Sequence, residues 1–166
     1  MYKITDHDRV FLKRAVELAR AAVAEGSQPF GSVLVDANGT VLFEDHNHVV
    51  TGDATQHPEF AIARWAATNV APEDRASCTV YTSGEHCAMC SAAHAQVGLG
   101  RIVYASSGDQ LRSWRREWGL DQGPAVMAPL PINAVAPNVP VAGPDPDLTE
   151  ELREIFAARW GVDDRA

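Results

Sequence analysis

The sequence predicts a single α/β domain in which helices cover both faces of a sheet. Segments with apolar residues at helical spacing alternate with short apolar runs bounded by turn residues. This alternation is typical of a sheet between two helical layers. A chain of 166 residues is long enough to bury one full hydrophobic core, and it contains no internal repeat or low-complexity tract. We therefore expect residues 1–166 to form one domain.

The N-terminal part predicts a helix followed by a hairpin. Residues 6–24 carry apolar side chains at helical spacing, and Asp6 is expected to cap that helix. Residues 31–35 and 40–44 are strand-like, and the Asn-Gly pair between them is a strong hairpin signal. After this hairpin we expect the strands to pair in parallel, because helices separate them along the chain.

The middle of the chain continues the alternation of helices and strands. Pro58 suits the first turn of a helix, where its missing N–H costs nothing. We expect helices over residues 57–69, 87–98 and 109–118, and strands over residues 78–83 and 101–105.

The C-terminal part predicts an extended, loop-rich segment and one helix. Residues 123–146 hold seven of the ten prolines of the chain, and a short strand is expected within them at residues 132–135. Residues 148–160 have the pattern of a last amphipathic helix. We treat residues 123–166 as part of the same domain.

The charge of the chain tells against a nucleic-acid partner. The formal net charge is −8, whereas phosphate backbones are bound largely by Lys and Arg. The one dense basic group in the sequence is Arg112, Arg115 and Arg116. We interpret it as a solvated helix face.

The length of the apolar runs and the number of cysteines bear on where in the cell the protein is expected. No run approaches the ~18 apolar residues of a membrane span, and the N-terminus is charged from Lys3 onward. We expect no membrane association and a cytoplasmic location. Three cysteines are too few for a disulfide framework. Cys78, at the start of an apolar run, is interpreted as a core residue.

The strongest chemical signal is one histidine followed by two cysteines. His57, Cys87 and Cys90 all lie at expected helix starts, where the helix dipole favours the thiolate form of cysteine. One imidazole and two thiolates suit zinc and leave its fourth position open. Glu59 follows His57 by two residues, so it can reach that position without being a ligand. The set predicts a metal-activated hydroxide beside a proton carrier, as needed to hydrolyse an amine off a ring.

A closed structural zinc site is the alternative interpretation of these residues. His86 or His94 would then supply the fourth ligand, since both lie close to the two cysteines in the sequence. Such a site would give Glu59 no role and would indicate a non-catalytic, zinc-stabilised binding module.

These motifs resemble those of the cytidine deaminase superfamily, whose pattern is His-x-Glu followed by Pro-Cys-x-x-Cys. Pro29-Phe30-Gly31, His46-Asn47 and Thr82-Ser83-Gly84-Glu85 resemble the branch that contains guanine deaminases and tRNA adenosine deaminases. The resemblance covers residues 6–106. It implies a three-layer α/β/α sandwich around a mixed five-strand sheet, often assembled as a homodimer.

The resemblance also implies roles for individual residues. It implies that His57, Cys87 and Cys90 bind one Zn²⁺ per subunit and that Glu59 carries protons between water, the substrate ring and the departing ammonia. Asn47 is similar to the asparagine that hydrogen-bonds the base in the family. Its other interpretation is an asparagine that satisfies loop backbone.

Further substrate contacts are expected on weaker grounds. Phe30 is a candidate to pack on the substrate ring or, alternatively, a core residue. Asp109 follows the fourth expected strand, where the branch places an acidic group. In guanine-deaminase-like relatives the C-terminal segment helps to close the pocket, which makes Trp160 a candidate cover residue. Its alternative role is to anchor the last helix.

Two residues depart from the family pattern. Pro58 stands where the family usually has alanine, whose backbone N–H contacts a substrate carbonyl, and proline lacks that donor. His86 stands where the family has proline, and it is a candidate substrate contact, a residue that supports the groups touching the metal or substrate, or a tolerated surface replacement. Loss of a polar partner in a binding site changes which substrates the site accepts. Both residues therefore bear on substrate specificity.

The sequence therefore predicts a zinc-dependent hydrolase that deaminates a free nucleobase, a nucleoside or a related aminated heterocycle. A purine of the guanine type is the first candidate substrate. The alternatives are a tRNA adenosine deaminase, a cytosine or cytidine deaminase, and the non-catalytic binding module.

Overall fold

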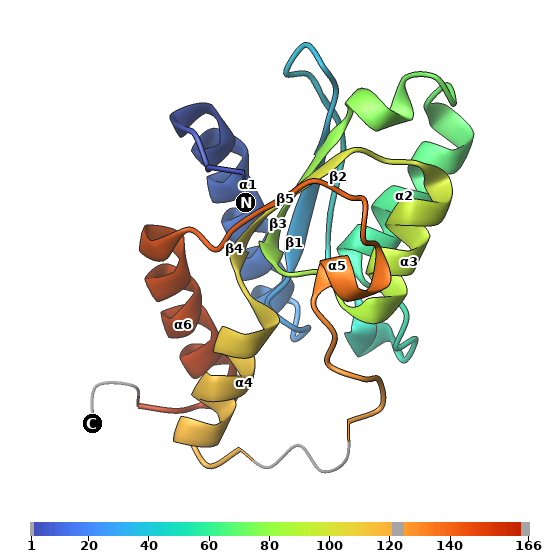
Figure 1. Cartoon of the computed structure of the whole chain (residues 1–166). Coiled ribbons are helices and arrows are strands. Elements are labelled where there is room, and N and C mark those ends of the chain that lie inside the picture. The colour runs from blue at the N-terminus through green and yellow to red at the C-terminus, as the bar shows by residue number, and fades with distance from the viewer. Residues whose placement is uncertain (1, 121–124, 164–166) are drawn as a thin grey trace.

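A computed structural model describes residues 2–120 and 125–163, and a mixed five-stranded sheet lies at its centre (Figure 1). The strand order is β2-β1-β3-β4-β5. The strands are β1 (Gly31–Val35), β2 (Val41–His46), β3 (Thr79–Gly84), β4 (Arg101–Ser106) and β5 (Val141–Ala142).

Helices cover both faces of this sheet, so the three-layer α/β/α sandwich is confirmed. One face carries α1 (Asp6–Ala24) and α6 (Pro146–Trp160), and the other carries α2 (Pro58–Asn69) and α3 (Ala88–Val97) (Figure 1). Helix α4 (Gly108–Glu117) follows β4, and the short α5 (Ile132–Val135) lies beside α3. Two 3₁₀ turns complete the described elements, Val49–Thr51 and Arg75–Ser77.

Only part of the pairing that follows the hairpin is parallel. Strands β3, β4 and β5 pair in parallel, but β1 pairs antiparallel with β3 as well as with β2. The reason is the crossover through α2, which carries the chain past β1 before β3 begins. Strand β3 thus runs in the direction of β2 but lies against β1, and the expectation of parallel pairing throughout was wrong at this step.

The core is divided between the two faces of the sheet. Along β1, Val33 packs in the cluster beneath α1 and α6, whereas Leu34 packs in the cluster beneath α2. This is the period of two that a strand imposes on its side chains. Because both faces are covered, every residue of β1 is buried. The apolar runs in the sequence follow from this burial.

The start of α1 differs from the expected one. Thr5, rather than Asp6, is the N-cap residue, and its side chain accepts a hydrogen bond from the backbone N–H of Asp8. The Asp8 side chain in turn bonds the Thr5 backbone, which completes a capping box. The side chain of Asp6 is fully exposed.

The expected strand at residues 132–135 is wrong, because this segment forms the single helical turn α5. Pro131 is its N-cap residue, and the side chain of Asn133 donates hydrogen bonds to the carbonyls of Ala136 and Val139. These bonds reverse the direction of the chain after α5. The chain then pairs with β4 through the short strand β5. No helix among the described residues is long and apolar enough to cross a membrane.

Candidate active site

Three soft ligand atoms form a nearly equilateral triangle on the side of the sheet that α2 and α3 cover. His57 is the N-cap residue of α2, Cys87 is the N-cap residue of α3, and Cys90 lies in the first turn of α3. The Nδ1 atom of His57 lies 3.7 Å from the Cys87 sulfur and 3.6 Å from the Cys90 sulfur, and the two sulfurs are 3.6 Å apart.

This triangle fits zinc. Zn–S bonds of about 2.3 Å and Zn–N bonds of about 2.0 Å, set at tetrahedral angles, place neighbouring ligand atoms roughly 3.5–3.8 Å apart. The three atoms therefore already stand where a tetrahedral zinc ion needs them. His94 is not part of the group, because its Nε2 lies 2.8 Å from the carbonyl oxygen of Gly100. The geometry thus favours three protein ligands over the closed four-ligand site.

Glu59 lies directly beside the triangle without belonging to it. One carboxylate oxygen, Oε2, is 3.8 Å from the sulfur of Cys90, and the other, Oε1, is 3.1 Å from the hydroxyl of Thr82 at the end of β3. Glu59 is only 5% exposed. Burial raises its pKa, which favours a carboxyl group that can take up and return a proton.

The two cysteines have opposite protonation behaviour. Hydrogen bonds from Cys90 and His57 lower the pKa of Cys87 to about 4, so Cys87 is a thiolate at neutral pH. Hydrogen bonding to that thiolate, together with burial, raises the pKa of Cys90. The hydrogen bond to Cys87 also raises the pKa of His57.

A cleft of about 290 Å³ opens beside the triangle. Its walls are the loop between β3 and α3, the start of α4 and residues 127–131, and Cys87 is among the lining residues. Three of the predicted substrate contacts, Phe30, His86 and Asp109, line this cleft. A cleft of this kind, lined by Cys87 of the triangle, is where a small substrate can be held.

His86 is the most unusual residue of the cleft wall. It is 2% exposed, and neither of its ring nitrogens has a hydrogen-bond partner among the described residues. Its ring contacts His94 edge-on at 5.5 Å, and burial lowers its pKa, so the ring is neutral. Buried polar atoms without partners are rare and costly. The tolerated surface replacement is therefore wrong, because His86 is not at the surface.

Phe30 and Asn47 lie next to each other where β1 begins and β2 ends. The ring of Phe30 contacts that of Phe156 at 5.5 Å, and its carbonyl accepts a hydrogen bond from the backbone N–H of Asn47. Asn47 is buried outside the lining of the cleft. Its Oδ1 accepts hydrogen bonds from Ser27 at 2.7 Å and from the backbone of Val49 at 3.1 Å.

Asp109 and Trp160 stand further from the triangle. The side chain of Asp109 is 91% exposed at the rim of the cleft and pairs with Arg112. Trp160 lies outside the cleft lining, where it packs on Phe156 at 5.2 Å and beneath the guanidinium of Arg115 at 4.4 Å. This packing shows that Trp160 anchors α6 against α4.

Two features of the cleft were missed in the sequence. Glu85 lines it and accepts hydrogen bonds from the backbone N–H groups of Gly108, at 2.9 Å, and Ile132, at 3.2 Å, so it ties α4 and α5 together. Arg112 and Arg115 also line the cleft, where the side chain of Arg112 is 42% exposed. The position of Glu85 in the family-like motif was the only available signal.

Two curated proteins have related sequences. The chain is 36% identical over 110 residues to a probable cytosine deaminase of Schizosaccharomyces pombe, which covers 66% of each protein. It is 41% identical over 97 residues to the guanine deaminase of Bacillus subtilis, which covers 57% of this chain and 56% of that protein. The alignments thus span less than two thirds of these relatives.

The solved structure of the Bacillus subtilis guanine deaminase aligns over 98% of both chains, at 26% identity and a TM-score of 0.56. The family model for the zinc-binding region of cytidine and deoxycytidylate deaminases matches residues 5–106. That match contains both helix starts that bring His57, Cys87 and Cys90 together. The chain therefore belongs to the cytidine and deoxycytidylate deaminase family.

Proposed function

We propose that this protein hydrolytically deaminates a free nucleobase, a nucleoside or a related small aminated heterocycle, with a guanine-type purine as the first candidate. The observation that carries the proposal is the carboxyl group of Glu59, buried beside a triangle of ligand atoms spaced for zinc. A structural zinc site has no need of a buried carboxyl group that is not a ligand.

The reaction replaces a C–NH₂ bond of the substrate by a C–O bond and releases ammonia. Zinc, when bound by His57, Cys87 and Cys90, lowers the pKa of water and so supplies hydroxide near neutral pH. Glu59 would take up the proton set free and deliver it to a ring nitrogen. It would then take the second proton from the hydroxyl group added to the ring and pass it to the amino group, which leaves as ammonia. Thr82, 3.1 Å from Oε1, holds the carboxyl group in place.

Residues at the start of β1, at the end of β2 and in the cleft wall orient the substrate in this proposal. Since hydrogen bonds to protein groups occupy Oδ1 of Asn47, the amide nitrogen of that side chain is the group that would donate to the base. Phe30 offers its ring in the cleft, and the neutral His86 forms part of the cleft wall with both ring nitrogens buried. Asp109 would contact the substrate from the rim.

A guanine-type purine is favoured by the resemblance of the motifs and by the guanine deaminase relative that is 41% identical over the aligned region. A cytosine-type base is the second candidate, because the relative that aligns over 66% of this chain is a probable cytosine deaminase. Pro58, buried at the first position of α2, cannot donate the backbone hydrogen bond that a carbonyl-bearing base receives in the family.

An ammonia-release assay across bases, nucleosides, pterins and triazines tests the proposal. We expect release from an aminated base, with guanine compared directly against cytosine. A Cys87→Ser variant, which lacks one ligand, serves as the inactive control. If the zinc-loaded protein releases no ammonia from any compound, the protein is a zinc-stabilised binding module instead.

A further inference from the structure

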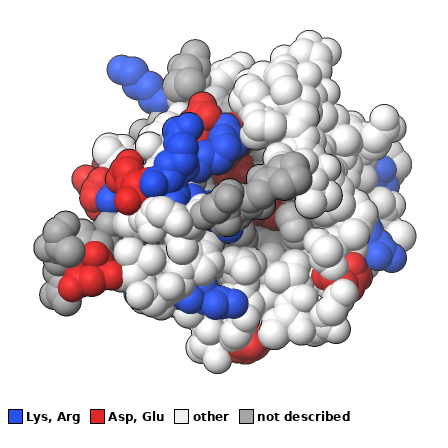
Figure 2. Space-filling view, turned by 90° about the horizontal axis from the view of Figure 1, so that it is seen from below, with Lys and Arg blue, Asp and Glu red and all other residues white. Residues whose placement is uncertain are grey.

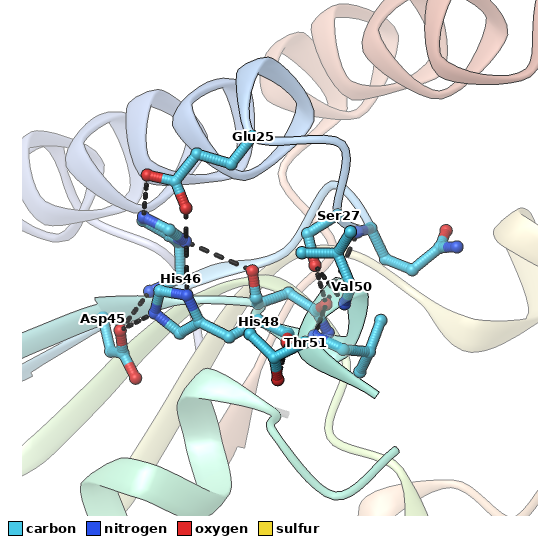
Figure 3. Close-up of polar contacts among 10 residues, drawn as sticks. Glu25, Ser27, Asp45, His46, His48, Val50 and Thr51 are labelled. Carbon is cyan, nitrogen blue, oxygen red and sulfur yellow. Dashed lines mark hydrogen bonds and ion pairs between the residues drawn. The ribbon is translucent and has the colours of Figure 1, made fainter. Parts of the chain in front are cut away.

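A second group of potential metal ligands lies outside the active site, between the end of α1 and the end of β2 (Figure 3). Among residues 2–120 and 125–163, two groups bring three ligand atoms within 4.8 Å of one another. One is the triangle of His57, Cys87 and Cys90, and the other is Glu25, His46 and His48. Figure 3 shows the carboxylate of Glu25 facing both imidazole rings.

Each imidazole ring of this group is held by one nitrogen and presents the other to Glu25. The Nε2 atom of His48 lies 2.9 Å from the carboxylate of Asp45, and the Nδ1 atom of His46 lies 3.2 Å from the carbonyl oxygen of Asn47. Both partners can only accept hydrogen bonds, so these two nitrogens carry the hydrogen atoms. In the neutral rings, Nδ1 of His48 and Nε2 of His46 therefore carry lone pairs.

With both rings neutral, three lone-pair-bearing atoms converge with no hydrogen between them. Nε2 of His46 is 3.4 Å from one oxygen of Glu25, and Nδ1 of His48 is 3.8 Å from the other. Both distances exceed the 2.7–3.2 Å typical of a hydrogen bond. The shorter distance is close to the roughly 3.3 Å that nitrogen and oxygen ligands keep around a tetrahedral zinc ion, and the longer one exceeds it. Such an arrangement repels itself unless a cation stands in the middle.

We propose that Glu25, His46 and His48 bind a second divalent metal ion, with zinc as the favoured ion. Two imidazoles and one carboxylate are a common ligand set for zinc and for other late divalent transition metals. Hydrogen bonds from ligating histidines to a carboxylate or a backbone carbonyl fix the ring orientation and increase ligand basicity. Asp45 and the Asn47 carbonyl already supply these bonds to His48 and His46.

The position of this site gives the bound ion a structural effect on the active site. His46 and His48 flank Asn47, and Asn47 accepts a hydrogen bond from Ser27, two residues beyond Glu25. An ion held by Glu25, His46 and His48 ties the end of β2 to the end of α1. It thereby fixes the segment that carries Asn47.

Counting bound zinc tests the proposal independently of catalysis. The full chain is dialysed at pH 8 against micromolar ZnCl₂, and the bound metal is measured by mass spectrometry. We expect two zinc ions per chain in the wild type, matching the two ligand groups. The Cys87→Ser/Cys90→Ser double variant should keep one ion, although it cannot catalyse. The His46→Gln/His48→Gln double variant should also keep one.

Two further single variants distinguish the loss of a zinc ligand from a folding defect. Glu25→Gln changes an exposed residue and should weaken the zinc bound by the cysteine double variant at least tenfold. His7→Gln changes an exposed histidine of α1 outside the group and should alter nothing. If the cysteine double variant binds no zinc, or if Glu25→Gln binds it equally well, the proposal is wrong.

Protonation of the rings is the competing explanation of this cluster, since an imidazolium would donate to Glu25 without any metal. Nitrogen-15 NMR of the cysteine double variant at pH 8 separates the two. Zinc should shift Nδ1 of His48 and Nε2 of His46 while the other ring nitrogens keep their hydrogens. Two doubly protonated rings that do not respond to zinc would show a proton-bridged cluster and overturn the metal site.

Discussion

Burial and hydrogen bonding shift the pKa values of three side chains at the ligand triangle. Cys87 is a thiolate at neutral pH, while Cys90 retains its proton, and Glu59 is buried with a raised pKa. Zinc requires both sulfurs as thiolates. Zinc binding must therefore displace the proton of the Cys90 thiol.

Zinc binding at pH 7 should consequently release protons, about one of them from the Cys90 thiol. Calorimetric titrations of the metal-free protein in buffers of different ionisation enthalpy measure this number. Lowering the pH toward the pKa of Cys87, about 4, should weaken zinc binding further as the thiolate is lost. A binding enthalpy independent of the buffer would contradict the protonation states described for the two cysteines.

Replacing His86 by an apolar residue should increase the stability of the protein and reduce its activity. Its ring is 2% exposed, and its nitrogens lack partners among the described residues. Replacing a buried unsatisfied polar side chain by an apolar one removes a penalty of about 1–3 kcal/mol. We expect His86→Met to raise the free energy of unfolding by about 1 kcal/mol and to raise KM, measured by urea titration and ammonia release. A variant that is more stable with unchanged KM would remove His86 from the substrate site.

At the scale of elements, the sequence predicted those parts that depend on local pattern. The hairpin, the helix starts at Pro58 and Cys87, and the apolar strands follow from turn chemistry and from the period of side-chain burial. The crossover that sets β3 against β1 could not be predicted, because both pairings bury the same strand faces. Nor could α5, whose hydrogen bonds through Asn133 depend on contacts made only after folding.

Asp8 shows an element-scale contact that the local pattern concealed. The residue is 2% exposed, although a charged residue at the start of a helix is expected at the surface. Its Oδ1 accepts hydrogen bonds from the Tyr81 hydroxyl, at 3.0 Å, and from Arg101, at 2.9 Å. It thereby fastens α1 to β3 and β4. Sequence spacing gives no sign of such a long-range contact.

Asp8→Asn should therefore destabilise the protein by about 2–4 kcal/mol at pH 7. Burial alone would raise the pKa of Asp8, but hydrogen bonds from the Thr5 backbone and Arg101 lower it below 3.8. The stability that this carboxylate contributes is thus present above pH 3.8 and is lost as the pH falls through the lowered pKa. Urea titrations of wild type and variant should converge below that pH. Asp6→Asn, at an exposed neighbour, is the matched control.

At the scale of the whole molecule, the charge of the surface bears on whether the substrate is a small molecule or a tRNA. The net charge is −8, and basic and acidic side chains stand side by side on the face seen in Figure 2. Arg112, which lines the cleft, is paired with Asp109. On that face the described Lys and Arg side chains gather mainly in one group, which acidic side chains adjoin.

We accordingly expect no salt-sensitive binding of tRNA. Retention on immobilised tRNA at low salt is the measurement, with the same protein on an uncharged matrix as the control. Binding that weakens steeply as salt is raised would indicate phosphate contacts. In that case the proposal of a small-molecule substrate would give way to a tRNA adenosine deaminase.

The central claim is that Glu59 moves protons beside a zinc ion that it does not bind. Glu59→Gln keeps the size of the side chain and its contact with Thr82 but removes the ionisable group. We expect ammonia release to fall by at least ~10²-fold, the usual scale for a lost acid–base catalyst. The zinc content at the triangle of His57, Cys87 and Cys90 should stay at the wild-type value. Turnover retained at the wild-type rate, or loss of that zinc together with the activity, would contradict the role assigned to Glu59.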